Sequence, residues 1–155
     1  MANERAVGTT DAAGGDGAAG VVLRPRPDAF DVESTSLADA FDSFDETWSP
    51  RIVAALNDQH VKVARLDGAF VWHSHADADE LFYVVEGALT VEYREDGDVD
   101  AVELAAGDLT VVPAGVEHRP VADGEAKVLL FEPAGTLNTG DANDDERTVS
   151  VPERL

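Results

Sequence analysis

The second half of the chain is dominated by short segments in which apolar and polar residues alternate. The clearest is ALTVEYR, in which Leu89, Val91 and Tyr93 share one side of an extended chain, as expected of a β-strand with one buried face. Glycines such as Gly87 and Gly107 stand between such segments and indicate turns. The alternation predicts eight strands, at 60–66, 69–74, 80–85, 88–94, 99–104, 109–112, 117–122 and 126–132. Short strands at this spacing predict an all-β sandwich or barrel.

Segments of different composition flank this strand-rich region. Residues 1–33 are rich in Gly, Ala and Asp without a period, which predicts a flexible leader with a short extended piece at 21–23. Residues 34–140 are expected to form one domain, which is long enough to bury a core of its own. The acidic segment 141–155 is expected to be a loosely ordered tail.

One or two short helices are predicted before the first strand. Ser36 is well placed to cap a helix over 37–44, in which four apolar residues recur at helical spacing. A second short helix is expected after Pro50, with Ile52, Val53 and Leu56 on one side.

Three of the four histidines fall in one arrangement. His73 and His75 are two residues apart on a predicted strand, so both side chains point to the same face. Glu80 opens the next strand and can point to that face as well, and His118 begins a later strand after the turn at Pro113. A His-x-His pair alone is weak evidence of a metal site, because two strand histidines can equally serve buried acceptors.

Three imidazoles and one carboxylate would suit one divalent transition metal ion. The sequence leaves Zn²⁺, Fe²⁺, Mn²⁺, Ni²⁺ and Cu²⁺ open as candidates. Four protein ligands would leave an octahedral ion two open positions, where a substrate or dioxygen can bind.

The spacing of these residues resembles the two sequence motifs of the cupin family. Gly68-x4-His73-x-His75-x4-Glu80-x6-Gly87 is similar to the first motif, and Gly107-x5-Pro113-x-Gly115-x2-His118 is similar to the second. The first glycine is one residue closer to the histidines than usual, and Ala122 stands where the second motif often ends in Asn. Phrases such as KVARLDGAFVWHSH and VVPAGVEHRPVAD resemble small single-domain cupins of bacteria and archaea, a group often labelled cupin or mannose-6-phosphate isomerase-like.

This resemblance implies a double-stranded β-helix, the cupin jelly-roll barrel, with one or two short N-terminal helices. It also implies that the metal ligands are His73, His75, Glu80 and His118. Asp77 or Asp79 could replace Glu80, but the six-residue step from Glu80 to Gly87 favours Glu80.

The function implied by the resemblance is a metal-dependent enzyme acting on a small organic substrate, either an oxygenase, an isomerase or a lyase. Catalytic residues are not assigned. A non-catalytic small-molecule binding or sensor protein is the alternative, and a structural metal site without an open position is a third. A sugar phosphate is not indicated, because no Lys/Arg cluster surrounds the site and Arg119 is expected to point away from it.

The remaining aromatic and polar residues near the motifs have plainer interpretations. His60 lies outside the motifs and is expected at the surface or an interface. Trp72 should face away from the metal and pack against a second sheet or a partner subunit, so a homodimer through this outer face is expected. Phe82 and Val84 share the face of Glu80 and should line the pocket or simply fill the core. The segment 135–140 is either a capping loop or a lid at the barrel mouth.

The charge of the chain limits its partners. The sequence contains 32 acidic and 11 basic residues, a formal net charge of −21. Such a charge repels phosphate backbones and anionic headgroups, so neither nucleic acid nor membrane surfaces are expected partners. Strong acidity is also typical of disorder, but the apolar strands argue for a folded domain with an acidic surface. Asp-rich, Lys-poor surfaces resemble those of proteins from salt-loving microbes, where salt screens self-repulsion, and a halophilic source is expected.

The sequence also argues against cysteine chemistry, a Ser–His–Asp arrangement, secretion and a membrane span. The sequence has no cysteine, so disulfides and thiolate chemistry are excluded. A Ser–His–Asp arrangement is not expected either, because the metal site would occupy the well-placed histidines. No basic region precedes an apolar stretch at the N-terminus, and no run approaches the ~20 apolar residues of a membrane span. A cytoplasmic protein is therefore expected.

Overall fold

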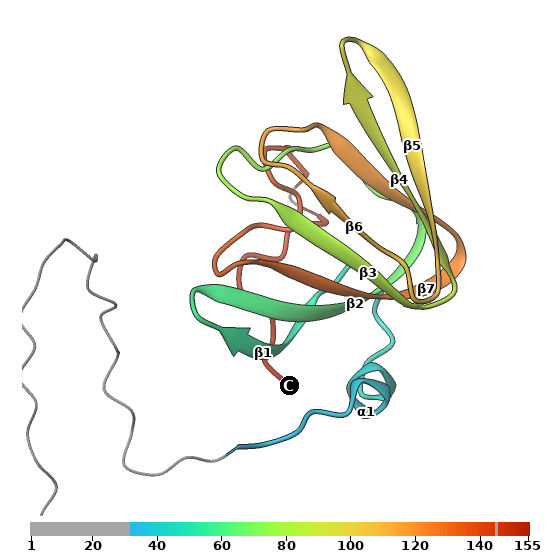
Figure 1. The fold of residues 1–155 in the computed structure, drawn as a ribbon. Helices are drawn as coiled ribbons and strands as arrows, with labels where there is room; N and C mark the ends of the chain where they lie inside the picture. The colour runs from blue at the N-terminus through green and yellow to red at the C-terminus, as the bar shows by residue number, and fades with distance from the viewer. Residues whose placement is uncertain (1–31, 145) are drawn as a thin grey trace, which may run out of the picture. The chain divides into compact units, whose positions relative to one another are not determined.

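The computed structural model describes residues 32–144 and 146–155, so the leader predicted for 1–33 lies outside the described residues except for its last two positions. In the described part, one short helix precedes seven strands (Figure 1): α1 (Leu37–Asp42), β1 (Arg51–Leu56), β2 (Gln59–Ala69), β3 (Glu80–Glu86), β4 (Ala88–Glu95), β5 (Asp98–Ala105), β6 (Leu109–Val112) and β7 (His118–Pro133). Residues 34–155 form one compact unit. No helix in this described part has the length and apolar character needed to cross a membrane.

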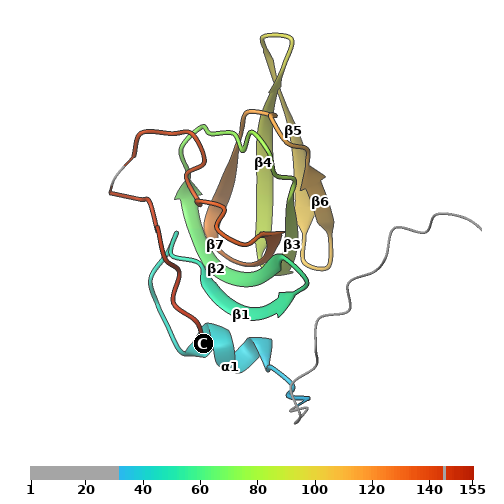
Figure 2. The same cartoon turned by 90° about the vertical axis from the view of Figure 1, so that its left-hand side faces the viewer.

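Helix α1 begins where its sequence predicts. The Ser36 side chain accepts a hydrogen bond from the Asp39 N–H at 3.2 Å, which satisfies one of the free donors of the first turn. The helix ends at Asp42, two residues earlier than expected. Phe41 and Phe44 are buried against Val63 of β2, so α1 covers one part of the outer surface of the sheet (Figure 2).

The second predicted helix is wrong, because residues 51–56 form strand β1. The apolar run was too short for its spacing to separate a helix from a strand. Ile52 and Val53 are β-branched and favour extended backbone. Asn57 adopts a positive φ of 55° in the turn that follows, which returns the chain antiparallel along β2, with Leu56 opposite Gln59.

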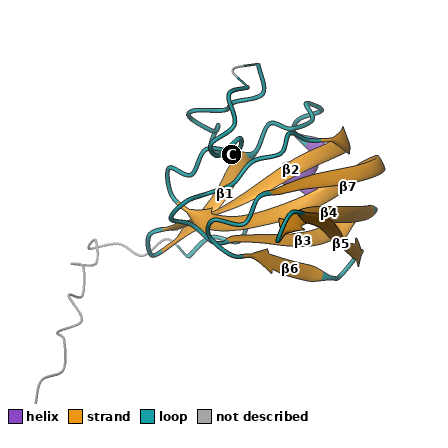
Figure 3. Ribbon diagram, turned by 90° about the horizontal axis from the view of Figure 1, so that it is seen from above, coloured by secondary structure: helices purple, strands orange, loops and turns teal. Residues whose placement is uncertain are grey.

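The strands form a network in which β7 is the central member. The order is β1-β2-β7-β3-β6, and the β4–β5 hairpin joins it by pairing with β7 (Figure 3). The chain does not reverse direction at the turn predicted for 123–124. The two strands expected at 117–122 and 126–132 are therefore a single strand, β7. Its first residues pair with β4 and its last with β3, and β2 pairs along most of its length. This long bent strand therefore connects the two halves of the fold.

The core is enclosed by alternate residues of these strands. In β3 and the second half of β7, buried residues alternate with partly exposed ones, which confirms the period-two pattern. The buried residues of the main core are Ala64, Leu66, Phe82, Val84, Leu89, Val91, Leu104, Val112, Ala122, Ala126, Val128 and Leu130. The all-β class is thus confirmed, and the arrangement fits a jelly-roll barrel.

The described residues after Gly140, where a loosely ordered tail is expected, include two that form backbone hydrogen bonds with β1. Ile52 N donates to Glu153 O at 2.8 Å, and Leu155 N donates to Ile52 O at 3.0 Å. Arg51 also forms an ion pair with Glu153 at 3.4 Å. The acidic composition gave no sign of this pairing. Backbone groups form these hydrogen bonds with the exposed edge of β1, so the bonds do not depend on the type of side chain.

Candidate metal centre

The histidines and the glutamate of the sequence motifs occupy the beginnings of strands and one short bridge between them. Glu80 is the first residue of β3 and His118 the first of β7. Of the segment 69–74, predicted as a strand, Ala69 ends β2, and His73 forms an isolated bridge in which His73 and His118 exchange backbone hydrogen bonds at 2.8 and 3.0 Å. This exchange brings the two imidazoles to the same place.

The four side chains converge in the interior of the protein. Their ligand atoms all lie within 4.8 Å of one another, and all four residues are buried. Glu80 Oε2 lies 3.2 Å from His75 Nε2 and 3.0 Å from His118 Nε2. Asp77 is exposed, and Asp79 accepts a hydrogen bond from Ala114 N at 2.8 Å, so Glu80 is the carboxylate of the cluster.

Backbone carbonyls orient two of the imidazoles. His73 Nδ1 lies 2.9 Å from Val71 O, and His118 Nδ1 lies 2.9 Å from Val116 O. A carbonyl oxygen only accepts, so each Nδ1 must carry the proton and each Nε2 keeps its lone pair for the centre of the cluster. The donor set is therefore suited to a divalent ion.

The protonation states of His73 and Glu80 also fit this role. Burial, followed by the neighbouring His118, lowers the pKa of His73 to about 4, so its imidazole is neutral near pH 7. Burial would raise the pKa of Glu80, but its close contacts with the imidazoles of His118 and His75 outweigh burial and leave that pKa below its ordinary value. Burial alone would lower the pKa of His75, but the contact with Glu80 outweighs burial and raises that pKa above its ordinary value. A neutral imidazole and an ionised carboxylate are the forms that coordinate metals.

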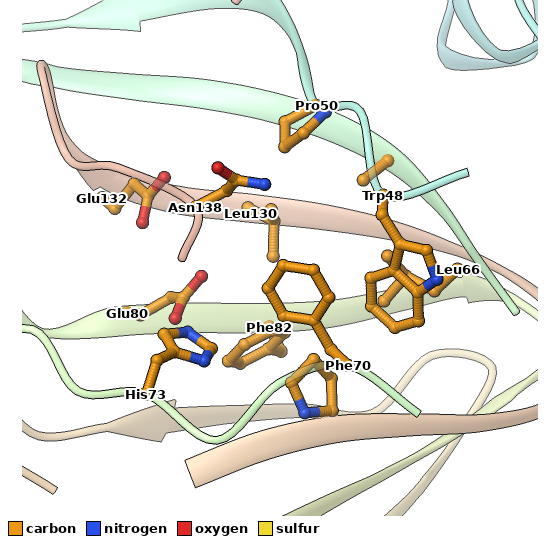
Figure 4. Close-up of a pocket in the computed structure, with 12 residues that line it drawn as sticks. Trp48, Pro50, Leu66, Phe70, His73, Glu80, Phe82, Leu130, Glu132 and Asn138 are labelled. Atoms are coloured by element: carbon orange, nitrogen blue, oxygen red, sulfur yellow. The ribbon is translucent and has the colours of Figure 1, made fainter. Parts of the chain in front are cut away.

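A small cavity of about 30 Å³ lies beside the cluster. His73 and Glu80 lie at one end of it, and Trp48, Phe70 and Leu66 lie at the other (Figure 4). The rings of Trp48 and Phe70 are stacked with centroids 4.7 Å apart. Of the two residues expected to line the pocket, Phe82 does so, and Val84 is buried in the core.

The segment 135–140 is fastened to the loop that carries the histidines. Ser74 N donates to Asp141 Oδ1 at 2.6 Å, and Asp141 N donates to Ser74 O at 3.1 Å. A Cβ at Gly140 would collide with the Ser74 carbonyl, and Gly140 has a positive φ of 51°. The end of the segment at Gly140 thus lies in close contact with Ser74, and this contact suits a capping loop as well as a lid.

Sequence reasoning missed a buried ion pair next to the cluster. Lys62 Nζ lies 2.7 Å from Glu132 Oε1, and both side chains are 2% exposed. Burial, followed by the charge of Glu80, raises the pKa of Glu132 to about 7, although Lys62 acts in the opposite direction. The available signal was a lysine, one of only two in the chain, at an inward position of the strand pattern.

The other residues singled out in the sequence lie away from the cluster. His60 is half-buried on β2 and is not among the four converging residues. Trp72 is partly exposed and is not a member of either buried core cluster of the described residues. The guanidinium groups of Arg94 and Arg119 lie 4.3 and 5.0 Å from its ring centroid. Arg119 also pairs with Glu92 at 2.5 Å, so it points away from the cavity as expected.

Comparison with known proteins identifies the family. Residues 60–132 match the family model described as a cupin domain. A cupin-2 domain containing protein from Shewanella frigidimarina, whose structure is solved, is 42% identical, with a TM-score of 0.60 over 64% of this chain and 93% of that one. This chain belongs to the cupin-2 domain family. The expected small cupin is thus confirmed, whereas the isomerase-like grouping is not shown.

Curated relatives of this cupin cover it in part. An uncharacterized protein of Bacillus subtilis, YdbB, is 37% identical over 67 residues, which are 43% of this chain and 57% of YdbB. The acireductone dioxygenase of Phaeosphaeria nodorum is 30% identical over 126 residues, 76% of this chain and 68% of the dioxygenase. This cupin thus spans less than two thirds of the length of YdbB.

Proposed function

We propose that His73, His75, Glu80 and His118 bind one divalent transition metal ion and that the cupin is a metal-dependent enzyme acting on a small organic substrate. The observation that carries this proposal is the convergence of four buried ligand atoms within 4.8 Å. Two of these ligands also line an interior cavity. A bound ion would supply a Lewis acid and, if it is redox-active, a site for dioxygen.

The residues around the ion have separate tasks in this proposal. Val71 and Val116 hold the imidazoles in the coordinating tautomer through their carbonyl groups. Phe70 and Phe82 exclude water from the cavity, which strengthens electrostatic interactions inside it. Among the oxygenase, isomerase and lyase classes, we favour an oxygenase, because a dioxygenase is among the relatives with the largest shared length.

The metal site is tested by metal content. Protein purified without chelator should carry about one equivalent of a divalent transition metal, measured by mass spectrometry of the elements. His118→Ala should lose it, and His60→Ala, the matched control, should keep it because His60 is outside the cluster. Retention should decline as pH falls below about 6.5, because protons compete for the imidazoles. Metal loss in His60→Ala with retention in His118→Ala would contradict the site.

A non-catalytic small-molecule binding or sensor cupin is the second candidate. This candidate needs only the same four ligands and the cavity beside them, because a fold does not fix a function. Oxygen uptake by the metal-loaded protein with a panel of small oxygenated compounds separates the two. Ligands that raise the melting temperature without any oxygen uptake or product would favour the sensor.

We also propose a homodimer working in a salt-rich cytoplasm. The outer face of β6, β3, β7 and β2 presents a continuous apolar surface, because cross-strand partners share a face: Val61, Leu81, Tyr83, Leu109, Val111, Leu129 and Phe131. Leu109 is 57% and Val111 48% exposed. This surface, and not that of Trp72, is the better candidate for the interface, because copies of a chain with a net charge of −21 approach most easily through an uncharged face.

A further inference from the structure

Glu132 is a buried carboxylate that the proposed metal ligands do not use. The residue is 1% exposed, and its Oε1 accepts a hydrogen bond from Lys62 Nζ at 2.7 Å. Its Oε2 has no hydrogen-bond partner within the part of the chain that the structure describes. A buried, unpaired carboxylate oxygen is unfavourable, so a partner from outside the chain is expected there.

The cavity beside the metal ligands is where such a partner would bind. Glu132 lines the same cavity as His73 and Glu80. Figure 4 shows these three side chains at one end of it, with Trp48 and Phe70 at the other. A molecule in this space would therefore meet hydrogen-bonding groups at one end and aromatic carbon at the other.

Lys62 acts as a positioning residue for Glu132. The two side chains come from the paired strands β2 and β7, and Lys62 Nζ also lies 3.4 Å from Thr136 O. Because Lys62 occupies Oε1 and supplies the compensating positive charge, Glu132 can stay buried with Oε2 available. Asn138 also lines the cavity, but both ends of its amide already have a partner, since it donates to Arg147 O and accepts from Val149 N.

We propose that Glu132 Oε2 accepts a hydrogen bond from a hydroxyl group of the substrate, and that the substrate class is a small hydroxylated organic molecule that offers another oxygen to the metal. This inference rests on the proposed metal site. The cavity of about 30 Å³ accommodates the hydroxyl-bearing end of such a molecule. A molecule without a hydroxyl donor leaves Oε2 unpaired and binds less tightly.

The test measures binding, not turnover, with Co²⁺-loaded protein and two probes of similar size. Hydroxyacetone has a carbonyl oxygen and a hydroxyl donor, and methoxyacetone lacks the donor. Each is titrated while the Co²⁺ absorption spectrum is followed. At about pH 8, above the pKa of about 7 of Glu132, the parent protein should bind hydroxyacetone about tenfold more tightly, as expected for one hydrogen bond to a charged acceptor.

Three variants separate this role from a purely structural one. Glu132→Gln presents an amide to the cavity, so the preference should fall to about one or reverse. Lys62→Met with Glu132→Leu replaces the buried pair by apolar groups of similar volume, which favours folding, and should also abolish the preference. Glu86→Gln is the matched control, because Glu86 pairs with the other lysine, Lys127, at the surface, and it should keep the parent preference.

The outcomes distinguish this inference from the metal proposal. Bound Co²⁺ in all four proteins, with the same probe preference in each, would overturn the role of Glu132 and leave the metal site standing. Equal affinity of the parent for both probes would show that Oε2 is satisfied by a fixed water, which also overturns it. If the parent takes up no Co²⁺, the metal site is wrong and the role of Glu132 falls with it.

Discussion

The imidazole of His73 couples protonation to folding. Burial holds its pKa at about 4, against an ordinary value of 6.5. Between these values the unfolded chain binds a proton that the folded chain excludes, so stability is fully present above pH 6.5 and is lost as pH falls toward 4. We expect this residue to contribute about 3 kcal/mol to the loss in metal-free protein.

Urea unfolding of metal-free protein between pH 4 and 7 measures this contribution. His73→Asn should flatten the decline below pH 6.5, whereas His60→Ala should leave most of it in place, because His60 lies outside the buried cluster. The difference between parent and variant isolates His73 from His75, whose pKa is shifted in the opposite direction. An identical decline in the parent and His73→Asn would contradict the assignment.

Residue-level prediction succeeded where a motif specified the geometry. Period two placed His73 and His75 on one face, and the structure brings Glu80 and His118 to them. Lys62 and Glu132 were missed, because they are neighbours only through the pairing of β2 with β7. Nothing local to either residue reveals that pairing.

At the scale of elements, the loop 135–140 depends on one glycine. A Cβ at Gly140 would overlap the Ser74 carbonyl, and its φ is positive. Gly140→Ala should therefore lower the free energy of unfolding by about 2 kcal/mol. It should also increase hydrogen exchange at the amides of Ser74 and Asp141, which now bond across the two loops.

Gly135→Ala is the control for this experiment. Gly135 also has a positive φ, of 85°, but a Cβ there would meet nothing within 4 Å. Gly135→Ala introduces backbone strain alone, so it should lower the free energy of unfolding by less than Gly140→Ala does. It should not increase hydrogen exchange at the amide of Ser74. Equal effects of the two substitutions would show that the contact with Ser74 does not hold the loop.

Elements were predictable where alternation was long and turns were clear. The strand 109–112 was predicted with the bounds that the structure has, and β3, β4 and β5 differ by one residue at one or both ends. The errors fell on β1, where a short apolar run suits either structure, and on β7, where Asp123-Gly124 indicated a reversal. The strand expected at 69–74 was a further error, because β2 ends at Ala69 and only an isolated bridge follows at His73. Gly124 has a positive φ of 82°, but β2 continues alongside and keeps the strand in one piece.

For the whole molecule, the net charge opposes association of two copies, whereas the apolar outer face favours it. Two copies with a net charge of −21 repel each other, and the Debye length shrinks from about 10 Å at 0.1 M salt to about 3 Å at 1 M. Light scattering after size exclusion should therefore show a dimer whose fraction rises with KCl concentration. Leu81→Arg should keep the protein monomeric at every salt concentration.

Val99→Glu is the matched control for association. Val99 lies on β5, outside the proposed interface, and is 57% exposed, so the substitution adds a charge elsewhere and should leave the dimer intact. A monomer at molar KCl in the parent, or a dimer that persists in Leu81→Arg, would rule out this interface.

The central position of β7 has a consequence for synthesis on the ribosome. Strand β2 has its partner in β7, with Gln59 opposite Pro133 and Ala69 opposite Val121, and β3 and β4 also pair with β7. A nascent chain that has exposed β1 to β6 still lacks the strand that joins them, and pairings this distant in sequence form slowly. The emerging chain should therefore wait, with its apolar strands uncovered, until β7 has left the exit tunnel, and this waiting period is when a chaperone would bind it.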